Sequence, residues 1–240
     1  MIWILFIILI FILLALDLGV FHKGHQKVSM KSSLIWTSVW VGIAGLFGVL
    51  LYCMYDVHFL GLNELGMKPS EALIQFYSGY LIEESLSLDN IFVIALIFSF
   101  FKIEGKYQHN ILFWGILGAV FFRLIMIILG TAFVNKFEWA MMFFGAILTY
   151  SAFKMLKSGD EDTNFRDSIG VKLLAKVCPI DWDEDSGKYF VRKGNKKYAT
   201  TLFAALMVVE FSDILFAVDS IPAIFSVTKD PFIVFTSNIF

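Results

Sequence analysis

The stretch VVEFSDILFAVDSIPAI, residues 208–224, decides the fold of this chain. It carries three carboxylates, Glu210, Asp213 and Asp219. They lie inside an apolar run over residues 201–227. About 20 apolar residues are enough for a helix to cross a bilayer, so the three acids are expected at membrane depth. Each acid at the centre of such a helix costs about 2.5–3.5 kcal/mol on insertion scales. The chain must therefore compensate them with protons, cations or basic partners.

A second stretch, GYLIEESLSLDNIFVI at residues 79–94, repeats this pattern. With an offset of 130 residues, Asp89 falls on Asp219 and Glu83 falls on Asp213. Each copy has an acid, five intervening residues, and an Asp followed by a small polar residue. Internal repeats with a site near the membrane midplane are typical of secondary transporters. We therefore predict an all-α, polytopic transmembrane helical bundle with inverted-topology repeats that carry the two acidic motifs.

The composition agrees with a membrane protein, because 58% of the 240 residues are hydrophobic and Phe alone contributes 27. We expect one transmembrane domain with six complete spans. A seventh apolar segment, residues 232–240, is too short to cross a bilayer, so we expect that its element is incomplete here. The six complete spans are predicted at residues 2–18, 34–55, 72–101, 111–134, 139–155 and 202–227.

Residues 157–199 form a polar segment between the fifth and sixth predicted spans. It carries an acidic cluster over residues 181–185 and a basic stretch over residues 192–197. The run GKYFVRKGNKKYAT alternates in polarity and contains Gly-Asn, which predicts a short hairpin. We interpret the segment as a solvated loop with a regulatory or topogenic role. A cytosolic metal sensor built from the acidic cluster is the alternative.

The Lys and Arg residues of the loops predict the orientation. The loops after the first, third and fifth spans carry three, two and nine of them, whereas the other loops carry one each. By the positive-inside rule the first set is cytoplasmic, so the N-terminus lies outside and residues 157–199 form a cytoplasmic loop. The two spans with acidic motifs then run in opposite directions, as inverted repeats require.

The side chains of the two motifs point to a metal site built from oxygen ligands. Neither motif contains Cys or His, and oxygen ligands suit hard cations such as Mg(II), Ca(II) and Mn(II). One divalent ion with protons balances several carboxylates better than a monovalent ion does. Glu83 and Asp17 are expected as auxiliary or gate carboxylates. The midplane metal site is predicted to consist of Asp89, Asn90, Glu210, Asp213 and Asp219.

Some of these candidates also have a structural explanation. An ion pair with Arg123, the base in the core of the bundle, could explain one or two of the acids but not all of them. Asp17 lies near the end of a span and could be an interfacial acid. Glu83 and Glu84 are adjacent and face different ways, and the repeat favours Glu83.

Pro222 is predicted to kink or unwind the helix of the second motif. Proline has no amide hydrogen, so the carbonyl of Val218 loses its helical donor. That carbonyl is a further candidate ligand, as in the discontinuous helices of transporters.

Several functional classes are not expected. The motif pair of intramembrane aspartyl proteases, a nucleophile elbow and a phosphate-binding P-loop do not occur, so we do not expect an enzyme. No basic face is interleaved with aromatic residues, so we do not expect nucleic-acid binding. Cys53 lies in a predicted span and Cys178 in the polar loop, so no disulfide is expected between them.

The chain resembles the TerC family of integral membrane proteins. The resemblance is carried by LDLGVFH (16–22), GYLIEESLSLDN (79–90), KYQHNILFWGILGAVFFR (106–123) and VEFSDILFAVDSIPAIFSVTKDPFIVFTSN (209–238). The first acidic motif of the family is similar to E-K-S-L-S-x-D-N, and Glu84 stands here where a Lys is common. This departure leaves Glu83 as the motif acid.

The resemblance implies metal-ion handling. Members of the family are linked to manganese efflux, to tellurium resistance and, in plastids, to thylakoid membrane assembly, and the wider group resembles LysE-type exporters. We therefore expect an exporter of Mn(II), coupled to protons, that serves ion homeostasis in a bacterial inner (plasma) membrane. The expected partners are a divalent metal cation and the lipid bilayer, and a homo-oligomer is left open. The alternatives are a membrane scaffold for protein insertion or metal loading, and a Ca(II)/H⁺ exchanger.

Overall fold

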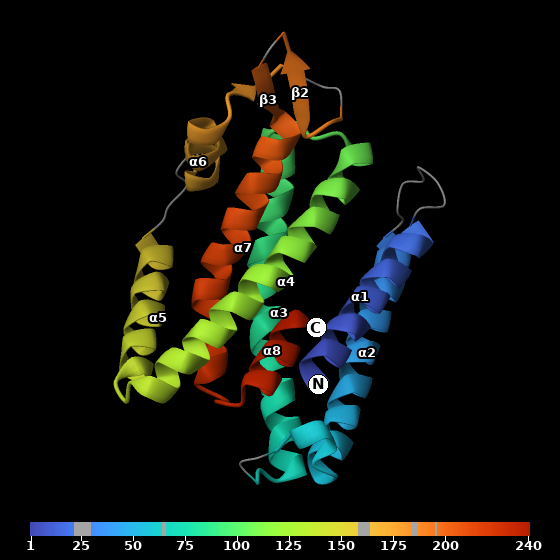
Figure 1. Ribbon diagram of the computed structural model, residues 1–240, viewed down its shortest axis with the longest axis vertical. Helices are drawn as coiled ribbons and strands as arrows, with labels where there is room; N and C mark the ends of the chain where they lie inside the picture. Colours follow the sequence, from blue (N-terminus) through green and yellow to red (C-terminus); the bar gives the residue numbers. More distant parts are fainter. Residues whose placement is uncertain (22–29, 64–65, 158–163, 184–186, 195) are drawn as a thin grey trace. The chain divides into compact units, whose positions relative to one another are not determined.

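The computed structural model describes residues 1–21, 30–63, 66–157, 164–183, 187–194 and 196–240, and α-helices dominate it (Figure 1). The chain divides into two units. The smaller unit comprises residues 1–80 and 232–240, and the larger unit comprises residues 81–231. Helix α3, Pro69–Phe100, contributes residues to both.

Phenylalanine rings form the core of the smaller unit. Its elements are α1 (Ile2–Phe21), α2 (Met30–Asp56), the 3₁₀ turn η1 (Phe59–Gly61), the first part of α3 and most of α8 (Pro231–Ile239). The ring centroids of Phe6 and Phe47 are 5.4 Å apart, and those of Phe47 and Phe240 are 4.7 Å apart. Such aromatic pairs stabilise a core beyond the area that they bury.

The larger unit is built on long helices. It contains the rest of α3, α4 (Gly105–Lys136), α5 (Ala140–Lys157) and α7 (Thr201–Phe225), and α7 packs against both α4 and α5. Ile97 of α3 shares an apolar cluster with Leu202 of α7, whereas Asn90 and Ser212 line one cavity. Residue numbers therefore increase along α3 in the direction in which they decrease along α7. The two motif helices run in opposite directions (Figure 1). The inverted repeat itself stays a prediction.

A small folded segment, residues 164–200, joins α5 to α7, and we call it the cap. It contains η2 (Phe165–Asp167), α6 (Ile169–Val177), β1 (Ile180–Asp181), β2 (Phe190–Lys193) and β3 (Lys196–Thr200). The strand order is β1-β3-β2, with β1 parallel and β2 antiparallel to β3. The predicted hairpin is confirmed as β2–β3, whereas α6 and β1 were not predicted.

An apolar cluster seals the cap against the helices. Val171 and Leu174 of α6 and Ala199 of β3 are buried in it. Ser168 caps α6, because its hydroxyl accepts from the amide of Val171. The helices contribute to the cluster Ile97, Phe98 and Phe101 of α3, Ile111 of α4, and Leu202, Ala204, Ala205, Leu206, Val208 and Val209 of α7.

Three of the described helices are long and apolar enough to cross a membrane, over Leu34–Asp56, Gly105–Lys136 and Thr201–Phe225. Two shorter apolar helices cover Ile2–Leu16 and Ala140–Phe153. Each predicted span coincides with a helix of the structure. Helix α3 differs from the three membrane-length helices because it carries several acidic residues along its length.

The predicted unwinding before Pro222 is not found. Helix α7 is continuous from Thr201 to Phe225 with Pro222 inside it. Ile221, Pro222 and Phe225 are all buried in this turn, although proline cannot donate to the carbonyl of Val218. The kink at this point stays a prediction.

Candidate functional site

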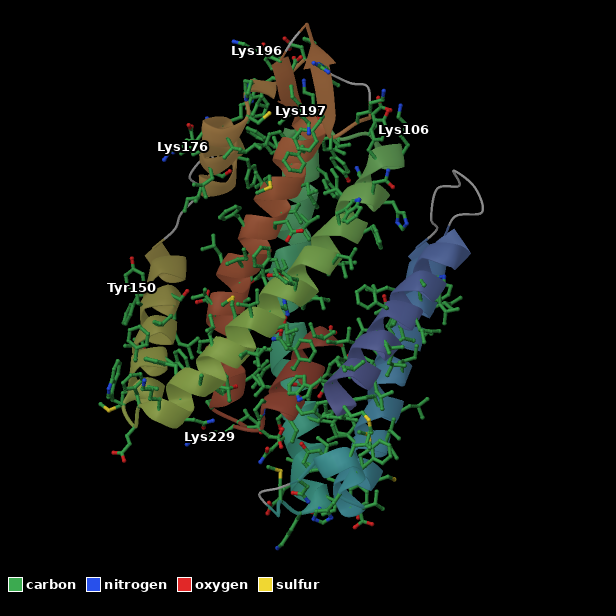
Figure 2. The ribbon with its side chains drawn as sticks, in the orientation of Figure 1. Lys106, Tyr150, Lys176, Lys196, Lys197 and Lys229 are labelled. Atoms are coloured by element: carbon green, nitrogen blue, oxygen red, sulfur yellow. The ribbon has the colours of Figure 1, made fainter. Side chains whose placement is uncertain are left out.

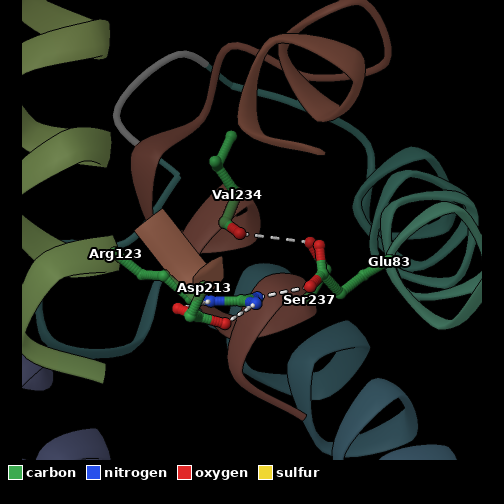
Figure 3. A network of polar contacts seen from close by, with 5 residues as sticks. All are labelled: Glu83, Arg123, Asp213, Val234 and Ser237. Atoms are coloured by element: carbon green, nitrogen blue, oxygen red, sulfur yellow. Dashed lines mark hydrogen bonds and ion pairs between the residues drawn. The ribbon is translucent and has the colours of Figure 1, made fainter. Parts of the chain in front are cut away.

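Arg123, halfway along α4, joins the two acidic motifs. Its Nη2 donates to Asp213 Oδ1 at 2.8 Å, and its Nε donates to Asp213 Oδ2 at 3.3 Å. Its Nη1 forms an ion pair with the carboxylate of Glu83 (Figure 3). The side chains of Arg123 and Glu83 are each only 9% exposed, and that of Asp213 is 19% exposed. The ion pair that was the structural alternative for one or two of the acids is therefore found, and it involves one acid from each motif.

The shape of the guanidinium explains this arrangement. Its planar fork donates two parallel hydrogen bonds to one carboxylate and keeps a third donor for another. A buried charge is tolerated only where it is paired and hydrogen-bonded. One cation against two carboxylates still leaves the ionised triad with a net negative charge.

Glu210 lies one helical turn before Asp213 and faces α4. Its carboxylate occupies the space beside Gly118, where the Cβ of any other residue would overlap it. Its Oε2 is buried and has no hydrogen-bond partner. Buried polar atoms are nearly always hydrogen-bonded, so this unpaired carboxylate oxygen requires an explanation.

A cavity of about 80 Å³ lies between α3, α4 and α7. Its polar lining comes from Asn90, Ser212 and Asp213. The Oδ1 atom of Asn90 is buried and, like Glu210 Oε2, has no hydrogen-bond partner. The remaining lining residues are Ile94, Leu112, Gly115, Ile116, Ala119, Val209 and Phe216.

Neither Asp89 nor Asp219 is among the residues that line this cavity. Asp219 accepts a hydrogen bond from Ser151 Oγ of α5 at 2.8 Å. Asp89 is exposed on α3. Asp17 belongs to α1 of the smaller unit, and its side chain lies outside the described residues.

The structure thus brings together only part of the predicted ligand set. Within the described part of the chain, no group of three or more His, Cys, Asp or Glu side chains is arranged to hold a metal. Glu83 and Asp213 meet at Arg123, and Asn90 and Asp213 meet at the cavity. The joint midplane site with Asp89 and Asp219 stays a prediction.

Sequence reasoning missed two residues that shape this region, Gly118 and Ser151. Gly118 belongs to the run Gly115-Ile-Leu-Gly118-Ala119, and small residues at such spacing allow close approach in membrane helices. That signal could have identified a crowded contact on α4. Nothing in the sequence singles out Ser151 as the partner of Asp219.

Comparison with known proteins gives consistent matches. The family model described as "Integral membrane protein TerC family" matches residues 68–240. An uncharacterized membrane protein of Myxococcus xanthus is 43% identical over 238 residues, which are 99% of this chain and 70% of that protein. The thylakoid membrane protein TERC of Arabidopsis thaliana is 40% identical over 226 residues, 94% of this chain and 56% of that protein.

The Alx protein of Escherichia coli K12 is 37% identical over 241 residues, which span this whole chain and 74% of that protein. No solved structure matches the chain. The family match covers most of the chain, and each relative aligns with nearly all of it, which confirms the resemblance carried by the motifs. The chain therefore belongs to the TerC family of integral membrane proteins.

Proposed function

We propose that this protein exports a divalent metal cation, Mn(II) before others, across the membrane. The observation that carries the proposal is the pair of buried oxygen atoms without hydrogen-bond partners, Glu210 Oε2 and Asn90 Oδ1. Both belong to helices that flank one cavity, and Asp213 lines the same cavity. Hydrogen-bond acceptors without partners inside a membrane helix bundle cost free energy. We therefore interpret these two oxygen atoms as ligands of a transported cation.

The charges near the cavity suit a divalent ion. Arg123 supplies one positive charge, whereas Glu83, Asp213 and Glu210 supply three negative charges when ionised. The difference of two is the charge of one divalent cation. The ligand atoms around the cavity are carboxylate, amide and hydroxyl oxygens, the set that Mn(II), Mg(II) and Ca(II) prefer.

Proton coupling follows from the same chemistry. Carboxylates bind a metal in the deprotonated form, so metal binding releases protons from the site. In the proposed cycle, cytosolic Mn(II) displaces protons and protons from outside later displace Mn(II). The ion gradient and the proton gradient are then linked through Glu210, Asp213 and their neighbours.

The test is Mn(II) flux in proteoliposomes that contain the purified protein. The parent protein should transport Mn(II), and an imposed pH gradient should change the rate. Glu210→Gln keeps the shape of the side chain and removes its charge, so flux should be lost. Glu84→Gln is the matched control, because Glu84 is exposed on α3 and should be dispensable.

Two outcomes would favour the alternatives. Absence of flux from a correctly folded parent protein would favour a scaffold that does not transport. Flux that Ca(II) carries in preference to Mn(II), in direct competition, would favour a Ca(II)/H⁺ exchanger. Flux without any proton movement would contradict the coupling alone.

A further inference from the structure

We infer that Arg123 competes with the metal cation for the carboxylate of Asp213. The guanidinium binds Asp213 when no metal is bound and releases it when the cation binds. This competition sets the affinity of the site for the metal. The inference rests on the proposed function and deepens it. It assigns the affinity of a cation site to a cationic residue of the same chain.

Asp213 faces both the cavity and Arg123. Asp213 lines the cavity between α3, α4 and α7, where it adjoins Asn90 and Ser212. Yet both of its carboxylate oxygens accept hydrogen bonds from Arg123, at 2.8 and 3.3 Å. A cation that enters the cavity therefore meets a ligand that a guanidinium already occupies.

The permanent positive charge of Arg123 determines how it can release Asp213. A guanidinium keeps its proton at all physiological pH values, so it cannot give up Asp213 by losing its charge. It can release Asp213 only by moving away. A divalent cation beside it would also repel it strongly, because charges interact far more strongly in a buried site than in water.

Glu83 is a second partner that can hold Arg123. A buried guanidinium without a partner would be strongly unfavourable. Glu83 binds the other side of Arg123, and its side chain is as buried as that of the arginine. Glu83 can therefore keep Arg123 when Asp213 passes to the metal, which explains why two acids rather than one flank this base (Figure 3).

A purely structural ion triad makes a different prediction. If Arg123 only fastens α3, α4 and α7 together, every disruption of the triad should loosen the site and weaken metal binding. If Arg123 competes with the metal, two disruptions should have opposite signs. The variants Glu83→Gln and Arg123→Gln/Glu83→Gln separate these cases.

The experiment measures equilibrium binding of Mn(II) to the detergent-solubilised full chain, by the electron paramagnetic resonance signal of free Mn(II). Glu83→Gln should weaken binding, because the guanidinium is then held by Asp213 instead of being shared. Arg123→Gln/Glu83→Gln should strengthen binding by about tenfold, within the usual range of coupling between two sites. The double variant avoids a buried glutamate without its base, and Gln at both positions can still hydrogen-bond.

Flux gives a second readout that a structural role would not produce. The double variant should bind Mn(II) more tightly and yet transport it more slowly, because nothing then helps to displace the ion. Gel filtration and thermal melting report whether each variant folds. If the double variant does not fold, Arg123→Lys takes its place. Lysine keeps the positive charge but cannot donate two parallel hydrogen bonds to Asp213, so this variant should also bind Mn(II) more tightly.

The outcomes distinguish the inference from the function beneath it. Tighter binding in the double variant together with weaker binding in Glu83→Gln supports the inference. A parent that transports Mn(II), with a folded double variant or Arg123→Lys variant that binds no more tightly, overturns the inference and leaves the proposed function intact. A parent that neither binds nor transports Mn(II) overturns both.

Discussion

At the scale of single residues, Gly118 of α4 makes room for a buried acid. The Glu210 carboxylate fills the place that a Cβ would take at this position. Gly118→Ala should therefore lower the free energy of unfolding by about 1–3 kcal/mol, the usual cost of overpacking, and should reduce Mn(II) flux. Thermal melting in detergent and vesicle flux measure the two effects.

Gly145→Ala is the control for this prediction. Gly145 is a helical glycine of α5 with open space where a Cβ would lie. Alanine favours a helix over glycine by up to about 1 kcal/mol, so this variant should be neutral or slightly stabilised. Equal behaviour of the two variants would show that the contact between Gly118 and Glu210 does not matter.

Ser151 of α5 is the second single residue with a specific role. Its hydroxyl donates to Asp219 at 2.8 Å. Loss of a hydrogen bond to a charged group costs about 1.5–3 kcal/mol, so Ser151→Ala should lower the melting temperature clearly. Ser85→Ala is the matched control, because the Ser85 hydroxyl bonds to the Leu81 carbonyl of its own helix and is exposed. A Ser151→Ala variant as stable as Ser85→Ala would contradict the prediction.

The sequence could predict the chemistry of the site better than its geometry. A lone base within apolar spans must find an acid, so an ion pair of Arg123 was predictable. Which acid it binds depends on the rotation of three helices about their axes, and repeat alignment does not contain that information. Asp89 and Asp219 match in the alignment, yet Asp89 is exposed and Asp219 binds Ser151 of α5.

At the scale of elements, the hairpin was predictable and the rest of the cap was not. Strand alternation and a turn signal predict β2–β3, and Gly194 has the positive φ of 63° that a tight turn uses. α6 has only nine residues within a polar segment, and β1 has two, so local pattern is too short to reveal them. Unwinding at Pro222 was wrong, because α7 continues through the one hydrogen bond that proline cannot make.

The cap also contains a pH-sensitive contact. The ion-paired hydrogen bond from Lys193 of β2 lowers the pKa of Asp181 in β1 below its ordinary value. A carboxylate whose pKa is lower in the folded state stabilises the fold above its unfolded pKa, and this contribution is lost as the pH falls. Asp181→Asn should therefore speed amide exchange in β2–β3 at pH 7.

The pH series checks the sign of this effect. The difference in amide protection between the parent and Asp181→Asn should shrink as the pH falls below about 4, where carboxylates become protonated. Asp183→Asn, at an exposed acid two residues further on, should leave the hairpin protection unchanged at every pH. A difference between parent and Asp181→Asn that grows in acid would contradict the assignment.

At the scale of the whole molecule, basic residues gather at one end of the larger unit. Lys106, Lys176, Lys196 and Lys197 lie at the end that carries the cap, and Lys229 lies at the opposite end (Figure 2). Basic residues concentrate on the cytoplasmic side of membrane proteins. We therefore propose that the end of the larger unit that carries the cap faces the cytoplasm.

Cysteine labelling tests this orientation. In a Cys53→Ser/Cys178→Ser background, Lys196→Cys should react with a membrane-impermeant maleimide in inside-out vesicles and not in intact spheroplasts. Lys229→Cys should give the reverse pattern. Both lysines are exposed, so access alone decides the result. Labelling of Lys196→Cys in intact spheroplasts would contradict the proposed orientation.

The seal between the cap and the helices has a mechanical consequence. One cluster clamps the last turns of α3, the start of α4 and the first turns of α7 together. Val209 is the last residue of α7 in this cluster, so Glu210 follows the clamped part of the helix directly. At 1.5 Å per residue, Asp219 lies about 15 Å further along α7 than Val209. A small rotation of α7 about the clamped part would therefore move Asp219 and its contact with Ser151 far more than it would move Glu210.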